Sequence, residues 1–157
     1  MRIQSLGECK LILNAILSTI NASITLDAPT KTSIPPSSPI FAAQIQNFDG
    51  PVQLDVAYNN ASLPSPFQLK VQNNGAPSNI IMDSTFQGCF NVQTKLSQVS
   101  VHDNANSLLR TLNFDTTTPN IATGWVGWRN RPAAQAACLS FVDAVSALGP
   151  VNLTFGV

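Results

Sequence analysis

Residues 44–56 read Q-I-Q-N-F-D-G-P-V-Q-L-D-V, an alternation of apolar and polar side chains that is interrupted by a short turn. The same form returns in Leu69 to Met82 and in Asp143 to Phe155, and Gly149-Pro150-Val151 copies Gly50-Pro51-Val52. Alternation with a period of two is typical of half-buried strands, and Gly- or Asn-rich residues between two such runs favour a turn. One strand, turn, strand unit therefore recurs along the chain, which indicates a repetitive fold.

The recurring unit predicts an all-β fold with two facing sheets, either a β-solenoid or a β-sandwich, built from hairpin-like repeats. If Gly50, Gly75, Gln98 and Gly149 are equivalent turn positions, the repeat is about 25 residues, with a degenerate copy at Leu109 to Trp128. Alternate residues of such sheets are buried. The expected core positions are Ile45, Leu54, Val56, Leu69, Val71, Ile81, Phe90, Val92, Val99, Val101, Val151, Leu153 and Phe155.

One segment, residues 133–148, fits two structures. Its apolar residues from Ala134 to Leu148 follow helical spacing, with Pro132 suited to a first helical turn and Gly149 to the end. The upstream units nevertheless match the stretch that follows Val142, so we expect a strand over Leu139 to Ser146.

The chain divides into an N-terminal segment (1–27), a Pro- and Ser-rich connector (28–39) and a β-repeat domain (40–157). The first segment resembles a weak signal peptide, since Arg2 precedes the apolar stretch Leu11 to Ile20, although Glu8 and Lys10 interrupt that pattern. Alternatively, Leu11 to Leu26 enters the sheet. No stretch has the ~20 apolar residues that cross a bilayer, so no transmembrane span is expected.

Composition narrows the class of protein. The chain of 157 residues is 44% hydrophobic and only 10% charged, with eight basic and eight acidic residues, so it should fold and should not bind nucleic acid. Polar residues in place of charges favour an extracellular or cell-surface location, with a cytoplasmic one as the alternative. Glycosylation sequons at Asn21, Asn60 and Asn152 point the same way, although three occur readily by chance.

The three cysteines allow two interpretations. Cys89 and Cys138 can pair in an oxidising compartment, or all three, with Cys9, are small buried apolar residues. The cysteine and histidine spacing contains no zinc motif, so no metal is expected, and no motif indicates a cofactor.

Catalytic chemistry finds little support. The only histidine, His102, is followed by Asp103, but neighbours on a strand point to opposite faces, so this Asp should not orient the imidazole. No catalytic residue is therefore predicted. Trp125 and Trp128, with Arg129 beside them, are the candidate ligand-binding residues, because an exposed indole can stack on a sugar. Alternation places the two indoles on opposite faces, so one is expected in the core.

Four short motifs stand out: F-Q-L-K-V-Q-N-N-G at Phe67 to Gly75, S-T-F-Q-G at Ser84 to Gly88, G-W-V-G-W at Gly124 to Trp128 and S-A-L-G-P-V-N-L-T-F at Ser146 to Phe155. Together they resemble a family of uncharacterised, adhesin-like proteins of mushroom-forming fungi, with repeated T-S-N-G or S-L-G-P-V turns. The resemblance implies an all-β adhesive domain without established activity.

The leading functional hypothesis is a non-enzymatic structural or adhesive protein of a fungal cell surface, with cell-wall glycan or protein as partner. The alternatives are a carbohydrate-binding module that uses an exposed Trp and, more weakly, a hydrolase that uses His102 and an Asp.

Overall fold

The structure is a computed structural model that describes residues 2–4, 9–16, 18–27, 41–59, 66–105, 107–128 and 138–156. The expected connector at 28–39 lies outside these residues. Every regular element that the structure describes is a strand. The strands are β1 (Arg2–Gln4), β2 (Cys9–Ala15), β3 (Ile20–Asp27), β4 (Phe41–Asn47), β5 (Val52–Tyr58), β6 (Phe67–Asn73), β7 (Ser78–Met82), β8 (Gly88–Thr94), β9 (Val99–Asp103), β10 (Arg110–Thr118), β11 (Ile121–Trp128), β12 (Phe141–Ser146) and β13 (Val151–Phe155).

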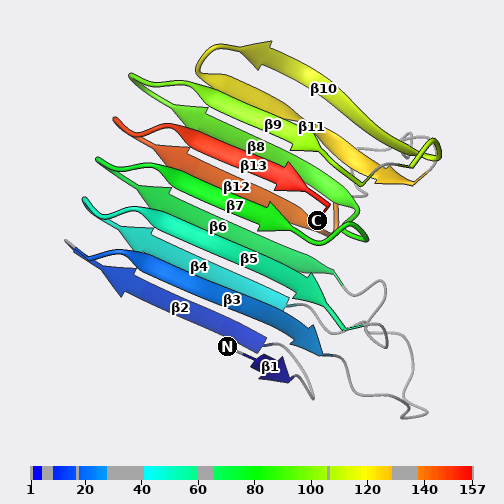
Figure 1. The fold of residues 1–157 in the computed structure, drawn as a ribbon, viewed down its shortest axis with the longest axis horizontal. Coiled ribbons are helices and arrows are strands. Elements are labelled where there is room, and N and C mark those ends of the chain that lie inside the picture. Colours follow the sequence, from blue (N-terminus) through cyan, green and yellow to red (C-terminus); the bar gives the residue numbers. More distant parts are fainter. Residues whose placement is uncertain are drawn as a thin grey trace.

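The strands form two sheets, which confirms the predicted all-β, two-sheet class (Figure 1). Sheet A has six strands in the order β1-β3-β5-β7-β13-β9, and sheet B has seven in the order β10-β11-β8-β12-β6-β4-β2. All pairs are parallel except those that involve β11, which is antiparallel to both β10 and β8.

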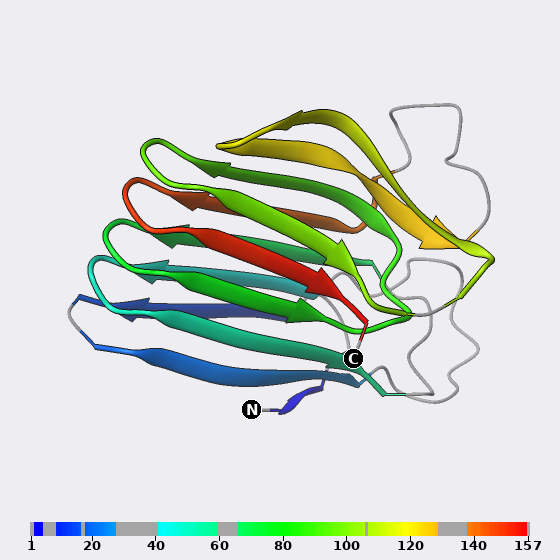
Figure 2. The ribbon, with the colours of Figure 1, turned by 45° about the horizontal axis from the view of Figure 1, so that its top comes forward.

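The repeated unit is an arch rather than a hairpin. In each unit the first strand lies in sheet B and the second in sheet A, so the two strands pair with equivalent strands of neighbouring arches and not with each other. Four residues join the strands in all five arches, β2/β3, β4/β5, β6/β7, β8/β9 and β12/β13. The turns lie along one edge of the molecule, on the left of Figure 2.

The strand bounds correct the expected equivalence of the turn residues. The third turn residue is Gly50, Ala76, Ser97 or Gly149, whereas the sequence pattern suggested Gly75 and Gln98 in place of the middle two. The glycine of N-N-G-A-P therefore occupies the second turn position. The backbone pairing of β4 with β6 shows which residues of the two turns are equivalent. The sequences N-N-G-A-P and N-F-D-G-P share a proline but have glycine at different positions.

The arches do not stack in sequence order. The C-terminal arch β12/β13 inserts between β6/β7 and β8/β9, so that β12 pairs with β6 and β8, and β13 pairs with β7 and β9. Figure 1 shows this arch in orange and red between green strands on either side. Strand β12 thus lies at the centre of sheet B, and β13 lies inside sheet A next to its edge strand β9.

The segment that was expected to be a degenerate copy of the repeat is a different element. Both of its strands, β10 and β11, lie in sheet B, and they form an antiparallel hairpin that pairs with β8. The register shifts between Phe114 and Thr116, which marks a bulge in the edge strand β10. A bulge and a polar Thr-rich edge hinder further strand pairing at this end of sheet B.

The core lies between the two sheets, at the positions that alternation selects. Ten of the thirteen predicted core residues are buried, while Val99 and Val101 are half-buried against the core. Ile81 is the error, because Ile80 and Met82 point inward instead. The sequence S-N-I-I-M has two consecutive isoleucines, and the pairing of Leu54 with Ile80 decides which one faces the core.

The structure also describes parts of the two segments for which the sequence left alternatives open. Residues 141–146 form strand β12, as expected. They belong to the stretch 133–148, whose apolar spacing also fitted a helix. Strands β2 and β3 pair in register with β4 and β5, so the stretch Leu11 to Leu26 contributes an arch to the two sheets.

A column of polar side chains lies inside the turns. Sheet B register aligns the last residues of its strands, and the column consists of Asn47, Asn73, Ser146 and Thr94, all at least 94% buried. Buried polar groups require partners. The amide nitrogens of the two asparagines and the hydroxyl groups of Ser146 and Thr94 find theirs in the turns, whereas Oδ1 of Asn47 and Oδ1 of Asn73 have no hydrogen-bond partner.

Hydrogen bonds from the two asparagines of this polar column join neighbouring turns. Nδ2 of Asn47 donates to the carbonyl oxygens of Gly50 (2.8 Å) and Ser18 (2.9 Å). Nδ2 of Asn73 likewise donates to the carbonyls of Ala76 (2.9 Å) and Gly50 (3.2 Å). The column therefore satisfies carbonyl groups that neither sheet can reach.

Replacing Gly149 by Ala should destabilise the protein by about 2 kcal/mol, the usual cost of overpacking a tight site. A Cβ at Gly149 would collide with the carbonyl oxygen of Ala76 in the neighbouring turn. Urea unfolding measures the effect. Ala76→Gly is the matched control at the equivalent position of another arch, and it should cost at most about 1 kcal/mol. Equal unfolding midpoints for Gly149→Ala and the wild type would contradict the close stacking of the turns.

Candidate functional site

The outer face of sheet B carries three in-register rows of side chains. The first row is Trp125, Cys89, Phe141, Gln68, Ala42 and Lys10; the second is Thr123, Asn91, Asp143, Lys70, Gln44 and Ile12; the third is Ile121, Gln93, Val145, Gln72, Gln46 and Asn14. Strands lie about 4.8 Å apart across a sheet, so each row is a regular series of groups. Because β12 is inserted, the rows combine residues from both ends of the chain.

Amide side chains are common in the second and third rows, where several of them bond to neighbouring polar side chains. Nδ2 of Asn91 donates to Oδ1 of Asp143 (2.8 Å), and Nε2 of Gln93 donates to Oδ1 of Asn91 (2.7 Å). Nε2 of Gln46 donates to Oε1 of Gln72 (2.9 Å). These bonds orient the amides and leave other donors and acceptors of the face directed to solvent.

An open depression of about 270 Å³ lies in the first two rows. Its lining includes Gln68, Lys70, Phe141 and Asp143, of which Gln68 and Lys70 are exposed and the other two half-buried. The combination offers a cation, an anion, an amide and part of an aromatic ring on one surface. The sequence alone does not predict this site, because its residues come from strands whose pairing has no local sequence signal.

The two tryptophans lie on opposite faces of β11, and neither forms an open platform. Trp125 is on the outer side of sheet B but is only 2% exposed, and it lies against Gly127. Trp128 is half-buried on the inner side, where its ring faces the guanidinium of Arg110 at 5.6 Å. Arg129, the third predicted ligand contact, lies outside the described residues.

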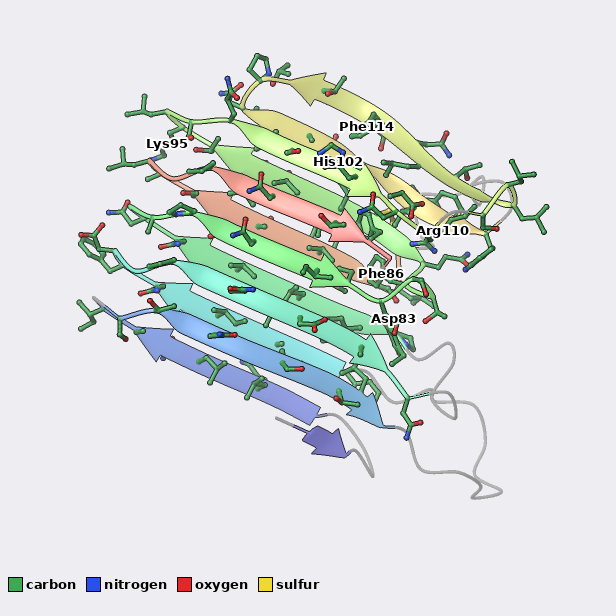
Figure 3. All side chains as sticks on the ribbon, viewed as in Figure 1. Asp83, Phe86, Lys95, His102, Arg110 and Phe114 are labelled. Atoms are coloured by element: carbon green, nitrogen blue, oxygen red, sulfur yellow. A yellow bond between two sulfur atoms is a disulfide. The ribbon has the colours of Figure 1, made fainter. Side chains whose placement is uncertain are left out.

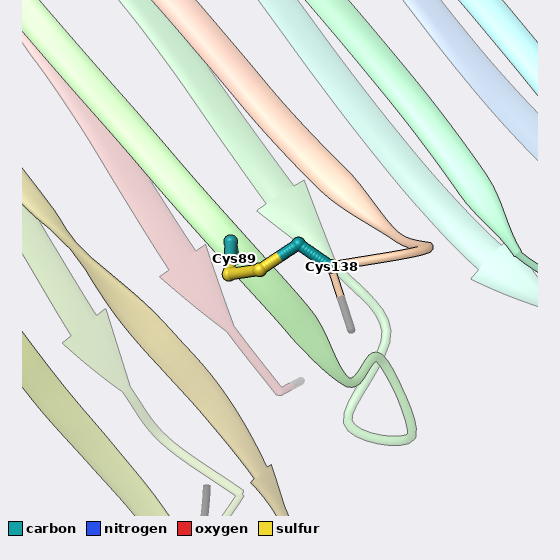
Figure 4. Close-up of a disulfide and its surroundings, with 2 residues drawn as sticks. All are labelled: Cys89 and Cys138. Carbon is teal, nitrogen blue, oxygen red and sulfur yellow. A yellow bond between two sulfur atoms is a disulfide. The ribbon is translucent and has the colours of Figure 1, made fainter. Parts of the chain in front are cut away.

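Cys89 and Cys138 form a disulfide with their Cα atoms 5.5 Å apart (Figure 4). Cys89 lies in the first row of sheet B between Trp125 and Phe141. The bond connects β8 to the segment that leads into β12, and so it anchors the start of the inserted C-terminal arch.

His102 lies on the exposed outer face of sheet A, and Asp103 points to the other side of the strand. Nε2 of His102 is 2.6 Å from Oγ of Ser100, the two atoms that a nucleophile and its base would use. Asp103 instead bonds to Arg110, so it does not orient the imidazole. The structure thus places His102 and Asp103 on opposite sides of β9.

Two of the three sequons lie on the outer face of sheet A, in the register row that also holds Gln53, Asn79 and Ser100. Asn21 is exposed, whereas Nδ2 of Asn152 donates to Oδ1 of Asn79 (2.7 Å). Asn60 lies outside the described residues. Glycosylation stays a prediction.

A buried ion pair connects the two sheets at the end opposite to the turns. Nε of Arg110, the first residue of β10, donates to Oδ1 (3.1 Å) and Oδ2 (2.9 Å) of Asp103, the last residue of β9. The side chains are 1% and 13% exposed. Burial lowers the pKa of Arg110, and the adjacent Asp103 opposes this shift.

Nearby, Asp83 holds the loop that follows β7. Its Oδ1 accepts from the backbone N–H of Thr85 (2.8 Å), and its Oδ2 accepts from the backbone N–H of Tyr58 (3.0 Å). Burial, together with the negative charge of Asp83, raises the pKa of Tyr58.

Two kinds of feature are absent from the residues that the structure describes. These residues contain no group of three His, Cys, Asp or Glu side chains that could hold a metal ion. They also contain no helix of the length and hydropathy that a membrane span needs.

Comparison with known proteins identifies no family. No family model matches the sequence, and no curated protein matches it significantly. Among solved structures, the chain is similar to a "putative cell adhesion protein" from Clostridium sporogenes, with 8% identity and a TM-score of 0.42 over 98% of this chain and 96% of that one. We draw no functional conclusion from a likeness at this level.

Removing the disulfide through Cys89→Ala and Cys138→Ala should lower the free energy of unfolding by about 2–4 kcal/mol, since the bond closes a long loop. Urea unfolding with and without reductant measures the change. Reductant should shift the unfolding midpoint of the wild type and leave that of the double variant unchanged. Labelling of both cysteines by iodoacetamide in the unreduced protein would show that the bond does not form.

Asp103→Ala should cost about 3 kcal/mol, because it leaves the guanidinium of Arg110 buried without its counter-ion. The double variant Asp103→Ala/Arg110→Met removes both charges and should recover much of that loss. A double-mutant cycle in urea gives the coupling energy. Additive effects of the two single substitutions would mean that the ion pair does not couple the sheets.

Proposed function

We propose that this chain is a non-enzymatic adhesive domain of a fungal cell surface that contacts cell-wall glycan through the outer face of sheet B. The observation that carries the proposal is the set of three in-register rows, rich in amides and open around the depression at Lys70. Amides both donate and accept hydrogen bonds, and so do the hydroxyl groups of a polysaccharide. A flat array suits a long polymer better than a small substrate.

The disulfide supports an extracellular location. Disulfides persist in oxidising compartments and are rare in the cytosol, and this one connects β8 to the segment that leads into β12. The low charge of the chain agrees with this location, because the outer faces rely on amide and hydroxyl groups. The resemblance to adhesin-like fungal proteins is the basis for naming a fungal surface.

A binding role accounts for the faces better than catalysis does. Ser100 and His102 make a nucleophile-and-base contact, but they stand on a flat exposed face, and Asp103 is engaged on the other side of β9. A catalytic dyad without an orienting group lacks the feature that holds the imidazole in its reactive position. The residues around Lys70, in contrast, surround a depression.

The test is retention of the purified protein on insoluble chitin and on β-1,3-glucan particles. The variant Gln68→Ala/Lys70→Ala should bind the retaining polymer about tenfold more weakly, since each lost hydrogen bond contributes roughly 1 kcal/mol. Gln53→Ala/Asn79→Ala, which alters exposed residues of sheet A, is the matched control and should bind as the wild type does. Equal weakening by both variants, or no retention of the wild type on either polymer, would refute the proposal.

A further inference from the structure

A groove crosses the outer face of sheet B where its strands meet the turns. Its volume is about 540 Å³, and its lining comes from β2, β4, β6, β12 and the turn that follows β8. One wall is part of the third row: Asn14, Gln46, Gln72 and Val145. Figure 3 places Lys95 at this edge of the molecule, away from Arg110. The groove is separate from the depression at Lys70, which lies in the first two rows.

The other wall of the groove consists of the first residue of each turn. The paired strands of sheet B end at equivalent positions, so the residues that follow form a second series: Ile16, Phe48, Asn74, Ala147 and Lys95. Neighbouring strands are about 4.8 Å apart, so Phe48 and Lys95 are separated by about 14 Å along the groove. A ligand that contacts both must be an extended chain.

This second wall changes in character from one end to the other. Ile16 and Phe48 are 71% and 59% exposed, so they present aliphatic and aromatic surface to solvent. At the other end Lys95 is exposed, and it is the only charged residue among the described residues of the lining. Asp49 follows Phe48, but it lies against Gly75 and is not part of the lining. An anionic group of a ligand would therefore be attracted to the lysine and would meet no carboxylate in the lining.

Accessible amides lie between the two ends. Gln46 and Gln72 are exposed, and Asn74 is half-buried. The bond from Nε2 of Gln46 to Oε1 of Gln72 orients both side chains and leaves Oε1 of the first and Nε2 of the second for a ligand. An acceptor and a donor therefore stand side by side, an arrangement that a hydroxyl group can match in both roles.

An extended peptide fits this groove less well than a sugar chain does. A peptide adds to a sheet along the edge of a strand, whereas this groove crosses strands whose backbone groups are already paired. The N–H and C=O groups of the peptide would then depend on side chains alone. A sugar chain instead offers hydroxyl groups to the amides and C–H faces to an aromatic ring.

We propose that this groove binds an acidic oligosaccharide, one whose sugar rings carry carboxylates. A carboxylate pairs with the ammonium group of Lys95. Hydroxyl groups bond to Gln72 and Asn74, and the C–H face of another ring packs on Phe48. The proposal rests on the glycan-binding role of sheet B and adds to it a preference for charged sugars.

The experiment compares two matched tetrasaccharides by isothermal titration calorimetry: cellotetraose and the tetramer of β-1,4-linked glucuronic acid. They differ in whether each ring carries a hydroxymethyl group or a carboxylate. The acidic tetramer should bind about fivefold more tightly at low salt, the effect expected of one exposed ion pair, and the difference should shrink at high salt.

Three variants assign the preference to the groove. Lys95→Gln should abolish it, so that both tetramers bind equally, and Phe48→Ala should weaken the binding of both about threefold. Lys70→Gln is the matched control, because it removes the same charge from the same face at the other depression, and it should keep the preference. All three side chains are exposed, so the variants should fold.

Retention on chitin and β-1,3-glucan, measured in parallel, separates this proposal from the adhesive function. Both polymers are neutral, so Lys95→Gln should be retained as the wild type is. A wild type that is retained but does not prefer the acidic tetramer overturns this proposal alone, and one that shows the preference but is retained on neither polymer overturns the adhesive function alone.

The proposal is also overturned if Lys95→Gln keeps the preference or if Lys70→Gln loses it. Tetraglutamate tests the remaining occupant, an acidic peptide, and should bind more weakly than the acidic sugar. Equal binding of the two would assign the groove to anions in general and would overturn the assignment to a glycan.

Discussion

The turns that join the two sheets are the constraint on which the rest of the structure depends. Each turn spans four residues, so the spacing of the sheets is fixed, and its inward carbonyl groups reach neither sheet. Asn47 and Asn73 satisfy these carbonyls, and each bonds to its own turn and to the one beside it. A shift of one arch against the next would leave these buried groups without hydrogen-bond partners. The polar column therefore holds the arches in register. The rows on the outer faces are regular for the same reason.

The place of the C-terminal arch makes both sheets depend on contacts that are remote in sequence. Until β12 and β13 are in position, the arches β6/β7 and β8/β9 have facing edges with unpaired backbone groups. Such contacts carry a large loop-closure cost and are slow to form, so we expect this insertion to complete folding. The disulfide of Cys89 and Cys138 holds β12 against β8 and limits the reopening of that gap.

Period-two alternation was enough to predict strands and most of the core, because residues such as Leu54 and Val71 must face inward in any two-sheet arrangement. It could not distinguish an arch from a hairpin, since Gly-Pro turns occur in both and the difference lies in which strands exchange hydrogen bonds. The order of the arches could likewise not be predicted, because no local sequence pattern indicates that Asp143 pairs with Lys70. The Arg110 site was missed because its partner is seven residues away, across a loop.

The distribution of charge has a consequence for how such a protein can adhere. Arg110 and Asp103, two of the few charged residues, are placed inside, where they connect the sheets, and most polar side chains of the outer rows are neutral. Neutral hydrogen-bonding groups exchange water for ligand at nearly equal free energy, so each contact contributes little. Adhesion through such a face must therefore come from many simultaneous contacts along a polymer, or from several copies acting together, rather than from one strong interaction. A rigid register suits this mode, because a polymer can meet the same row at every strand without the cost of reordering the side chains.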